Sequence, residues 1–186
     1  MDTLQNLLYE ISNALLIPTL IVLLGLAAYT VILAGGLLRE AITRSSVRRA
    51  IVAARRDIPG AFDHLAACSS GIPKRFTSLH TAHAGEHSKI LLDLENEIAA
   101  SLSKLTWTTR IAPMLGLMGT LIPLGPALTG LASGDMSLLS GNLVVAFTAT
   151  VIGVLIGCVA YTLNTVRRNW YDRDMLDLEF ITELKQ

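Results

Sequence analysis

The sequence predicts an all-α integral membrane protein with three transmembrane helices and cytoplasmic helical extensions. Its 186 residues are 52% hydrophobic and only 16% charged, whereas about 25% of the residues in a typical soluble domain are charged. Three stretches contain no charged residue: 11–38, 111–134 and 136–166, with 28, 24 and 31 residues. A helix needs about 20 apolar residues to cross the hydrocarbon core of a bilayer. Each stretch is therefore long enough for one span.

Composition also excludes two classes of protein. The 15 Lys and Arg residues balance 15 Asp and Glu residues, so the chain lacks the basic excess that holds a phosphate backbone, and no nucleic-acid partner is expected. Cys68 and Cys158 are the only cysteines, too few for the disulfide framework of a small secreted domain.

We interpret residues 1–38 as an outside N-terminus and the first transmembrane helix. A cleaved secretory signal would begin with a positively charged region, and Asp2 and Glu10 are the only charges before position 39. Eleven of the 15 Lys and Arg residues lie in 39–110 and the other four in 167–186. Because positive charges in flanking segments stay cytoplasmic, both segments are predicted to lie inside, with residues 111–166 forming a transmembrane hairpin directed outward.

The cytoplasmic segment 39–110 is predicted to be helical. Its first part reads as a basic helix that continues from the first span, and Pro59-Gly60 breaks it. Between His87 and Thr106, apolar residues recur at steps of three and four, namely Leu91, Leu94, Ile98, Leu102 and Leu105. This spacing is typical of an amphipathic helix that packs against a partner. We find no phosphate-binding loop, nucleophile elbow or zinc-ribbon pattern in the sequence, so no enzyme is expected.

Four histidines and a cysteine in this segment leave two interpretations open. His80, His83 and His87 are spaced i, i+3 and i+7, and His64 and Cys68 are spaced i and i+4. On helices each set would share a face, and imidazole and thiolate are good zinc ligands. The alternative, which we favour, is a solvated surface, so no metal site is predicted.

Small and polar residues line one face of each helix in the hairpin. The series in the third span is Asn142, Ala146, Thr150, Gly153, Gly157, Tyr161 and Asn164, and that in the second span is Gly116, Thr120, Pro123, Ala127 and Gly130. Such stripes allow close helix packing in membranes. Alternatively, part of each stripe lines an ion path, with Thr120 and Thr150 offering oxygens near mid-span. Pro123 and Pro126 each remove a backbone donor, which predicts a kink.

The motifs GLMGT at 116–120 and AFTATVIG at 146–153, joined by a short outward turn, resemble the MotA/TolQ/ExbB proton channel family. The resemblance implies a homo-oligomer, a pentameric ring in the cell (inner) membrane that encloses a single-span partner of the ExbD, TolR or MotB type. It also implies that Thr120 and Thr150 line the cavity near a membrane aspartate of that partner. Three positions depart from the family pattern: Val145 replaces a glutamate, Tyr161 or Thr162 a proline, and Leu121 an aromatic residue.

Two functions fit these residues. The first is the ring, or stator-like, subunit of an ion-driven motor. Because no Asp, Glu, Lys, Arg or His lies within the three uncharged stretches, its ionisable site would have to come from another chain. No cofactor is expected, and the transported ion would be H⁺ or Na⁺. The alternative is a membrane scaffold whose stripes serve only packing. Residues 167–186 read as a cytoplasmic amphipathic tail that begins with the interfacial residues Arg167, Trp170 and Tyr171.

Overall fold

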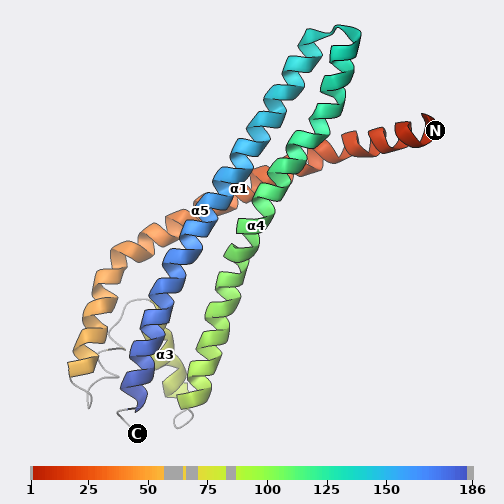
Figure 1. Ribbon diagram of the computed structural model, residues 1–186. Helices are drawn as coiled ribbons and strands as arrows, with labels where there is room; N and C mark the ends of the chain where they lie inside the picture. Colours follow the sequence, from red (N-terminus) through yellow and green to blue (C-terminus); the bar gives the residue numbers. More distant parts are fainter. Residues whose placement is uncertain (1, 57–64, 66–70, 83–86, 184–186) are drawn as a thin grey trace. The chain divides into compact units, whose positions relative to one another are not determined.

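The computed structural model describes residues 2–56, 65, 71–82 and 87–183. Four helices are seen in these ranges: α1 at Asp2–Arg56, α3 at Ile72–Ala82, α4 at His87–Ser133 and α5 at Met136–Glu183 (Figure 1). The described residues contain no strand. The all-α class is therefore confirmed.

Three of these helices are long and apolar enough to cross a membrane, which confirms the predicted number of spans. α1, α4 and α5 contain 55, 47 and 48 residues. At about 1.5 Å per residue, each is roughly 70 to 80 Å long, more than twice the roughly 30 Å of the hydrocarbon core. Each helix therefore combines an apolar span with a polar continuation, and the amphipathic stretch that begins at His87 runs without a break into the second span.

Two compact units make up the chain. The membrane unit comprises Met1–Leu33 and Leu105–Thr162, and the extension unit comprises Ala34–Lys104 and Leu163–Gln186. The first contains most of each uncharged stretch. The second contains nearly all the charged residues of 39–110 and 167–186, the two segments predicted to be cytoplasmic.

A tight turn joins α4 to α5 within the membrane unit (Figure 1). Gly134 has a φ of +77°, a conformation that glycine adopts without steric cost. The amide of Asp135 donates to the carbonyl of Gly130 at 2.8 Å, and the carboxylate of Asp135 accepts from the amide of Leu138 at 2.9 Å. These contacts satisfy backbone groups at both helix ends and hold α4 and α5 side by side and antiparallel.

The membrane unit has a small apolar core. Leu23 and Leu26 of α1 pack with Ala112 of α4 and with Ala149 and Ile156 of α5. Most of the remaining large apolar side chains of this unit are exposed, including Ile21, Leu117, Leu121, Phe147 and Val151. Such a surface is expected for a helix bundle whose neighbours are lipid and other membrane helices.

The extension unit has a larger core, to which all four helices contribute. Its buried residues are Val47, Ile51, Ala54, Leu65, Ile72, Phe76, Ile90, Leu94, Leu178 and Ile181. The amphipathic stripe of 87–106 and the tail after Arg167 therefore bury their apolar faces in a common core. Gly71 precedes α3 with a φ of +93°, a conformation that glycine adopts without steric cost.

Candidate functional site

The α4–α5 hairpin is held together by contacts between backbones. A Cβ added to Gly153 would lie 2.7 Å from the carbonyl oxygen of Ala112 and 2.8 Å from the Cα of Gly116. A Cβ added to Gly116 would lie 3.1 Å from the Cα of Gly153. Only glycine allows this approach. The seam extends along α5 to Gly157, where an added Cβ would lie 2.8 Å from Cγ of Pro113.

Thr120 and Thr150 occur at the same level of this hairpin. A Cβ added to Gly119 would lie 2.6 Å from the Cβ of Ala149, so these two residues face each other across the seam. Thr120 and Thr150 each follow one of them directly in the sequence. The tertiary structure therefore brings together two threonines that are 30 positions apart.

Both threonines also lie on the same side of the hairpin. Successive residues of an α-helix are related by a rotation of about 100° about the helix axis. Because Gly119 and Ala149 face each other across two antiparallel helices, the residue that follows each of them points to the same side of the hairpin. The opposite side contacts α1, since Thr148 and Ile152 line a groove together with Leu20 of α1. Thr120 and Thr150 therefore lie on the hairpin face turned away from α1.

The two hydroxyls make hydrogen bonds within their own helices. Thr120 Oγ1 donates to the carbonyl of Leu117 at 2.6 Å, and Thr150 Oγ1 donates to the carbonyl of Ala146 at 3.3 Å. A hydroxyl that donates keeps lone pairs for accepting. Each threonine is partly exposed, so these oxygens can accept from a protonated carboxyl or contact a cation.

The other predicted stripe residues separate into seam and surface. Gly153 and Gly157 are buried in the seam with Gly116, and Ala146 and Pro123 are buried on α5 and α4. Asn142 donates from Nδ2 to the carbonyl of Leu138 at 2.9 Å in its own helix. Tyr161 is 62% exposed and lies outside the seam. α4 continues through Pro113, Pro123 and Pro126 as one helix, and Pro123 removes the amide that the Gly119 carbonyl would otherwise accept from.

A polar cluster in the extension unit was not among the predicted site residues. Arg44 donates to both carboxylate oxygens of Asp174 at 2.8 and 2.6 Å and to the carbonyl of Trp170 at 3.0 Å. Its Cζ lies 5.1 Å from the centroid of the Trp170 ring. Burial raises the pKa of Asp174, and Arg44 lowers it by a smaller amount. The Asp174 side chain is buried, whereas that of Arg44 is 20% exposed.

A second polar contact lies beside the first. Glu40 is 3.5 Å from Nε of Arg167 and accepts from the Tyr171 hydroxyl at 3.5 Å. Burial, followed by the charge of Glu40, raises the pKa of Tyr171. The spacing of Glu40 and Arg44, and of Trp170 and Asp174, is i and i+4, which places each pair on one helix face. The i and i+4 spacing in the sequence could have suggested that each pair shares a helix face, but it does not identify the helices that pack against each other.

The histidine hypothesis cannot be followed in the structure. His64, Cys68 and His83 lie outside the described residues, as do the side chains of His80 and His87. Among the described side chains, no group of three potential metal ligands is found.

A sequence model of the MotA/TolQ/ExbB proton channel family matches residues 76–179. The match includes most of α3, all of α4 and nearly all of α5, with both threonines and the whole seam. The chain belongs to the MotA/TolQ/ExbB proton channel family. It is thus a multi-pass membrane protein of a channel family, as its three apolar helices also indicate. No curated protein and no solved structure gives a significant match to the chain.

Proposed function

We propose that this chain is the ring, or stator-like, subunit of an ion-driven membrane motor, which couples proton or sodium flow to mechanical work. Membership of a proton channel family supplies the general class. One observation supports the specific role: Thr120 and Thr150 occupy one level and one face of the α4–α5 hairpin, turned away from α1. Residues at that place would line a path enclosed by several copies of the hairpin.

The ion-binding carboxylate is assigned to a partner. No Asp, Glu, Lys, Arg or His occurs in 11–38, 111–134 or 136–166, and proton relays in membranes normally use such a group. A single-span partner of the ExbD, TolR or MotB type would supply a membrane aspartate beside the threonines. Their oxygens would accept from the protonated carboxyl or contact Na⁺, and no further cofactor is needed.

The assembly we propose is a homopentamer in the inner membrane, with the N-terminus outside and the C-terminus in the cytoplasm. The concentration of Lys and Arg in 39–110 and 167–186 supports this orientation. The exposed apolar surfaces of α4 and α5 offer the area that subunit contacts and lipid would cover.

The proposal can be tested in the complex purified in mild detergent from its own host. Native mass spectrometry should find five copies of this chain with a single-span protein that carries a membrane aspartate. In the same complex reconstituted in vesicles, Thr120→Val and Thr150→Val should reduce ion flux without loss of assembly. Thr148→Val and Thr129→Val provide matched controls, since both hydroxyls also donate to their own helices, at 2.7 and 3.1 Å.

A membrane scaffold is the second candidate, and the seam favours it. The glycines serve backbone packing, and both candidate hydroxyls donate to their own helices, as threonines without a transport role would. Unchanged flux in both Thr→Val variants, or an assembly in which no chain carries a membrane carboxylate, would favour the scaffold.

A further inference from the structure

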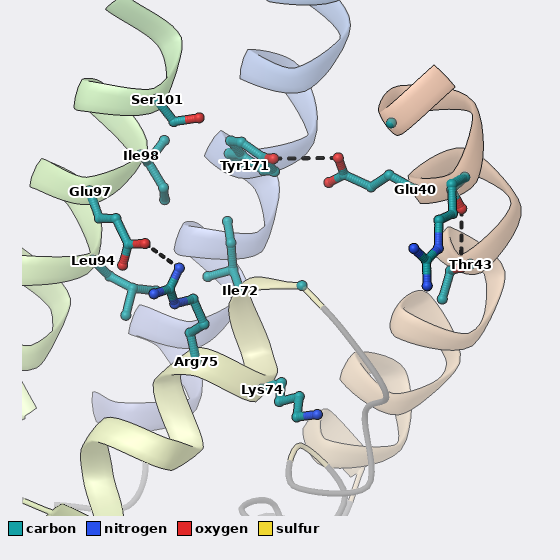
Figure 2. Close-up of a pocket in the computed structure, with 13 residues that line it drawn as sticks. Glu40, Thr43, Ile72, Lys74, Arg75, Leu94, Glu97, Ile98, Ser101 and Tyr171 are labelled. Carbon is teal, nitrogen blue, oxygen red and sulfur yellow. Dashed lines mark hydrogen bonds and ion pairs between the residues drawn. The ribbon is translucent and has the colours of Figure 1, made fainter. Parts of the chain in front are cut away.

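The extension unit contains a cavity of about 580 Å³ that the proposed ion path does not use. Residues from all four helices line it, and most are polar or charged (Figure 2). Three cations, Arg39, Lys74 and Arg75, face two carboxylates, Glu40 and Glu97. The lining therefore carries more positive than negative charge. Its volume is in the range typical of small-ligand sites, about 300 to 1,000 Å³.

Both carboxylates of the lining are already engaged. Glu97 forms an ion pair with Arg75, and Glu40 contacts Arg167 and Tyr171, each at 3.5 Å. Figure 2 shows the Arg75–Glu97 ion pair and the Tyr171–Glu40 hydrogen bond on different walls of the cavity. In contrast, no hydrogen bond or ion pair of the Arg39 guanidinium is seen within the described part of the chain, and its side chain is exposed. Arg39 is thus positioned to attract an anion, and Lys74 adds to the positive field.

The cavity begins where the first uncharged stretch ends. Gly36, which lines it, belongs to the stretch 11–38, and Arg39 is the first charged residue after that stretch. Leu38, between them, is 64% exposed. An apolar helix surface that gives way to an arginine marks the depth of lipid headgroups, where cations bind anionic lipids. The surface of α1 at Gly36 is nearly open, since an added Cβ there would meet only one atom within 4 Å, a terminal nitrogen of Arg167 at 3.5 Å.

The remaining polar groups suit a phosphate. A guanidinium binds phosphate oxygens in pairs and an ammonium binds them as a point charge. Figure 2 shows Ser101 at the opposite end of the cavity from Lys74. We propose that this cavity binds the phosphate group of an anionic phospholipid headgroup, held by Arg39 and Lys74. A free phosphate would use the same groups, and the two sources differ only in whether acyl chains contribute.

Binding can be measured on the full complex in mild detergent, with dihexanoylphosphatidylglycerol, dihexanoylphosphatidylcholine and inorganic phosphate as probes. The anionic lipid should bind more tightly than the zwitterionic lipid. Arg39→Gln combined with Lys74→Gln should weaken it roughly tenfold or more, given the contribution of each cation near a membrane surface. Arg39→Lys should retain most of the affinity, because the charge stays in place. Circular dichroism and gel filtration would verify that each variant is folded and assembled.

Arg49→Gln combined with Arg168→Gln is the matched control. It also removes two positive charges, from exposed side chains outside the cavity, and should leave the affinity unchanged. If inorganic phosphate binds as tightly as the anionic lipid, the cavity is a phosphate site, and its ligand is a soluble phosphate and not a lipid headgroup. Equal losses in the cavity and control pairs, equal binding of the two lipids, or no binding of any probe would overturn the proposal. None of these outcomes depends on ion conduction.

Discussion

Gly116 and Gly153 touch through their backbones at the centre of the α4–α5 seam, where a Cβ on Gly153 would lie 2.8 Å from the Cα of Gly116. The antiparallel register that this contact fixes puts Gly119 opposite Ala149. It therefore also sets the common level of Thr120 and Thr150. Packing and the proposed ion path are thus two results of one close approach, and the seam can be tested separately from the hydroxyls.

Gly153→Ala should destabilise the hairpin. The added methyl group would meet backbone atoms of Ala112 and Gly116, which cannot rotate away, and overpacking of this kind costs about 1 to 3 kcal/mol. Gly141→Ala is the control, because an added Cβ there meets nothing within 4 Å and alanine favours a helix. Thermal unfolding in detergent, followed by tryptophan fluorescence, should show a lower midpoint for Gly153→Ala alone. Equal midpoints for the two variants would argue against a tight seam.

The hydroxyl of Thr150, and not its shape, should support ion flux. Thr150→Val removes the oxygen and keeps the volume, and loss of a needed polar contact predicts a roughly tenfold or larger reduction in flux. Thr150→Ser should restore most of the flux, since it returns the oxygen. The vesicle assay described above measures both. A valine variant with normal flux, or a serine variant as impaired as valine, would assign Thr150 to packing.

Asp174→Ala should strongly destabilise the extension unit. It would leave the partly buried guanidinium of Arg44, whose side chain is 20% exposed, without its carboxylate. Loss of one partner of a buried pair costs about 3 to 5 kcal/mol. Arg44→Met combined with Asp174→Leu should be milder than Asp174→Ala, because it leaves no unpaired charge. Midpoints of chemical unfolding of the complex would compare the variants, and the reverse order would contradict this account.

Leu178 should anchor the C-terminal tail, and Leu176 should not. Leu178 is fully buried in the core of the extension unit, whereas Leu176 is 65% exposed. Leu178→Ala is expected to cost about 2 to 5 kcal/mol, and Leu176→Ala below about 0.5 kcal/mol. Truncation after Tyr171, which removes Leu178 and Ile181 together, should be more damaging than either substitution. Gel filtration and melting of the purified complex would measure this, and a truncated form with unchanged stability would show that the tail is dispensable.

The three spans could be predicted from the sequence because lipid imposes a requirement that a single segment meets by itself. A run such as 136–166 has to be long and free of charge, whatever it packs against. The amphipathic stretch before the second span could also be predicted, because its apolar spacing shows that it packs against a partner. The spacing does not identify that partner. Leu94 meets that partner in a core shared with Leu178, a pairing of residues too distant in sequence for periodicity to reveal.

For the candidate site, the residue types could be read from the sequence: glycines in stripes, threonines in two motifs, and no ionisable group in the spans. The positions of these residues relative to one another depend on how the helices pack. The tertiary structure assigned Gly116 and Gly153 to a backbone seam, left Tyr161 exposed, and brought Thr120 to the level of Thr150 on the face away from α1. It alone joined Arg44 to Asp174. The physical reason is that composition and period are properties of one helix, whereas register, facing and charge pairing exist only between helices.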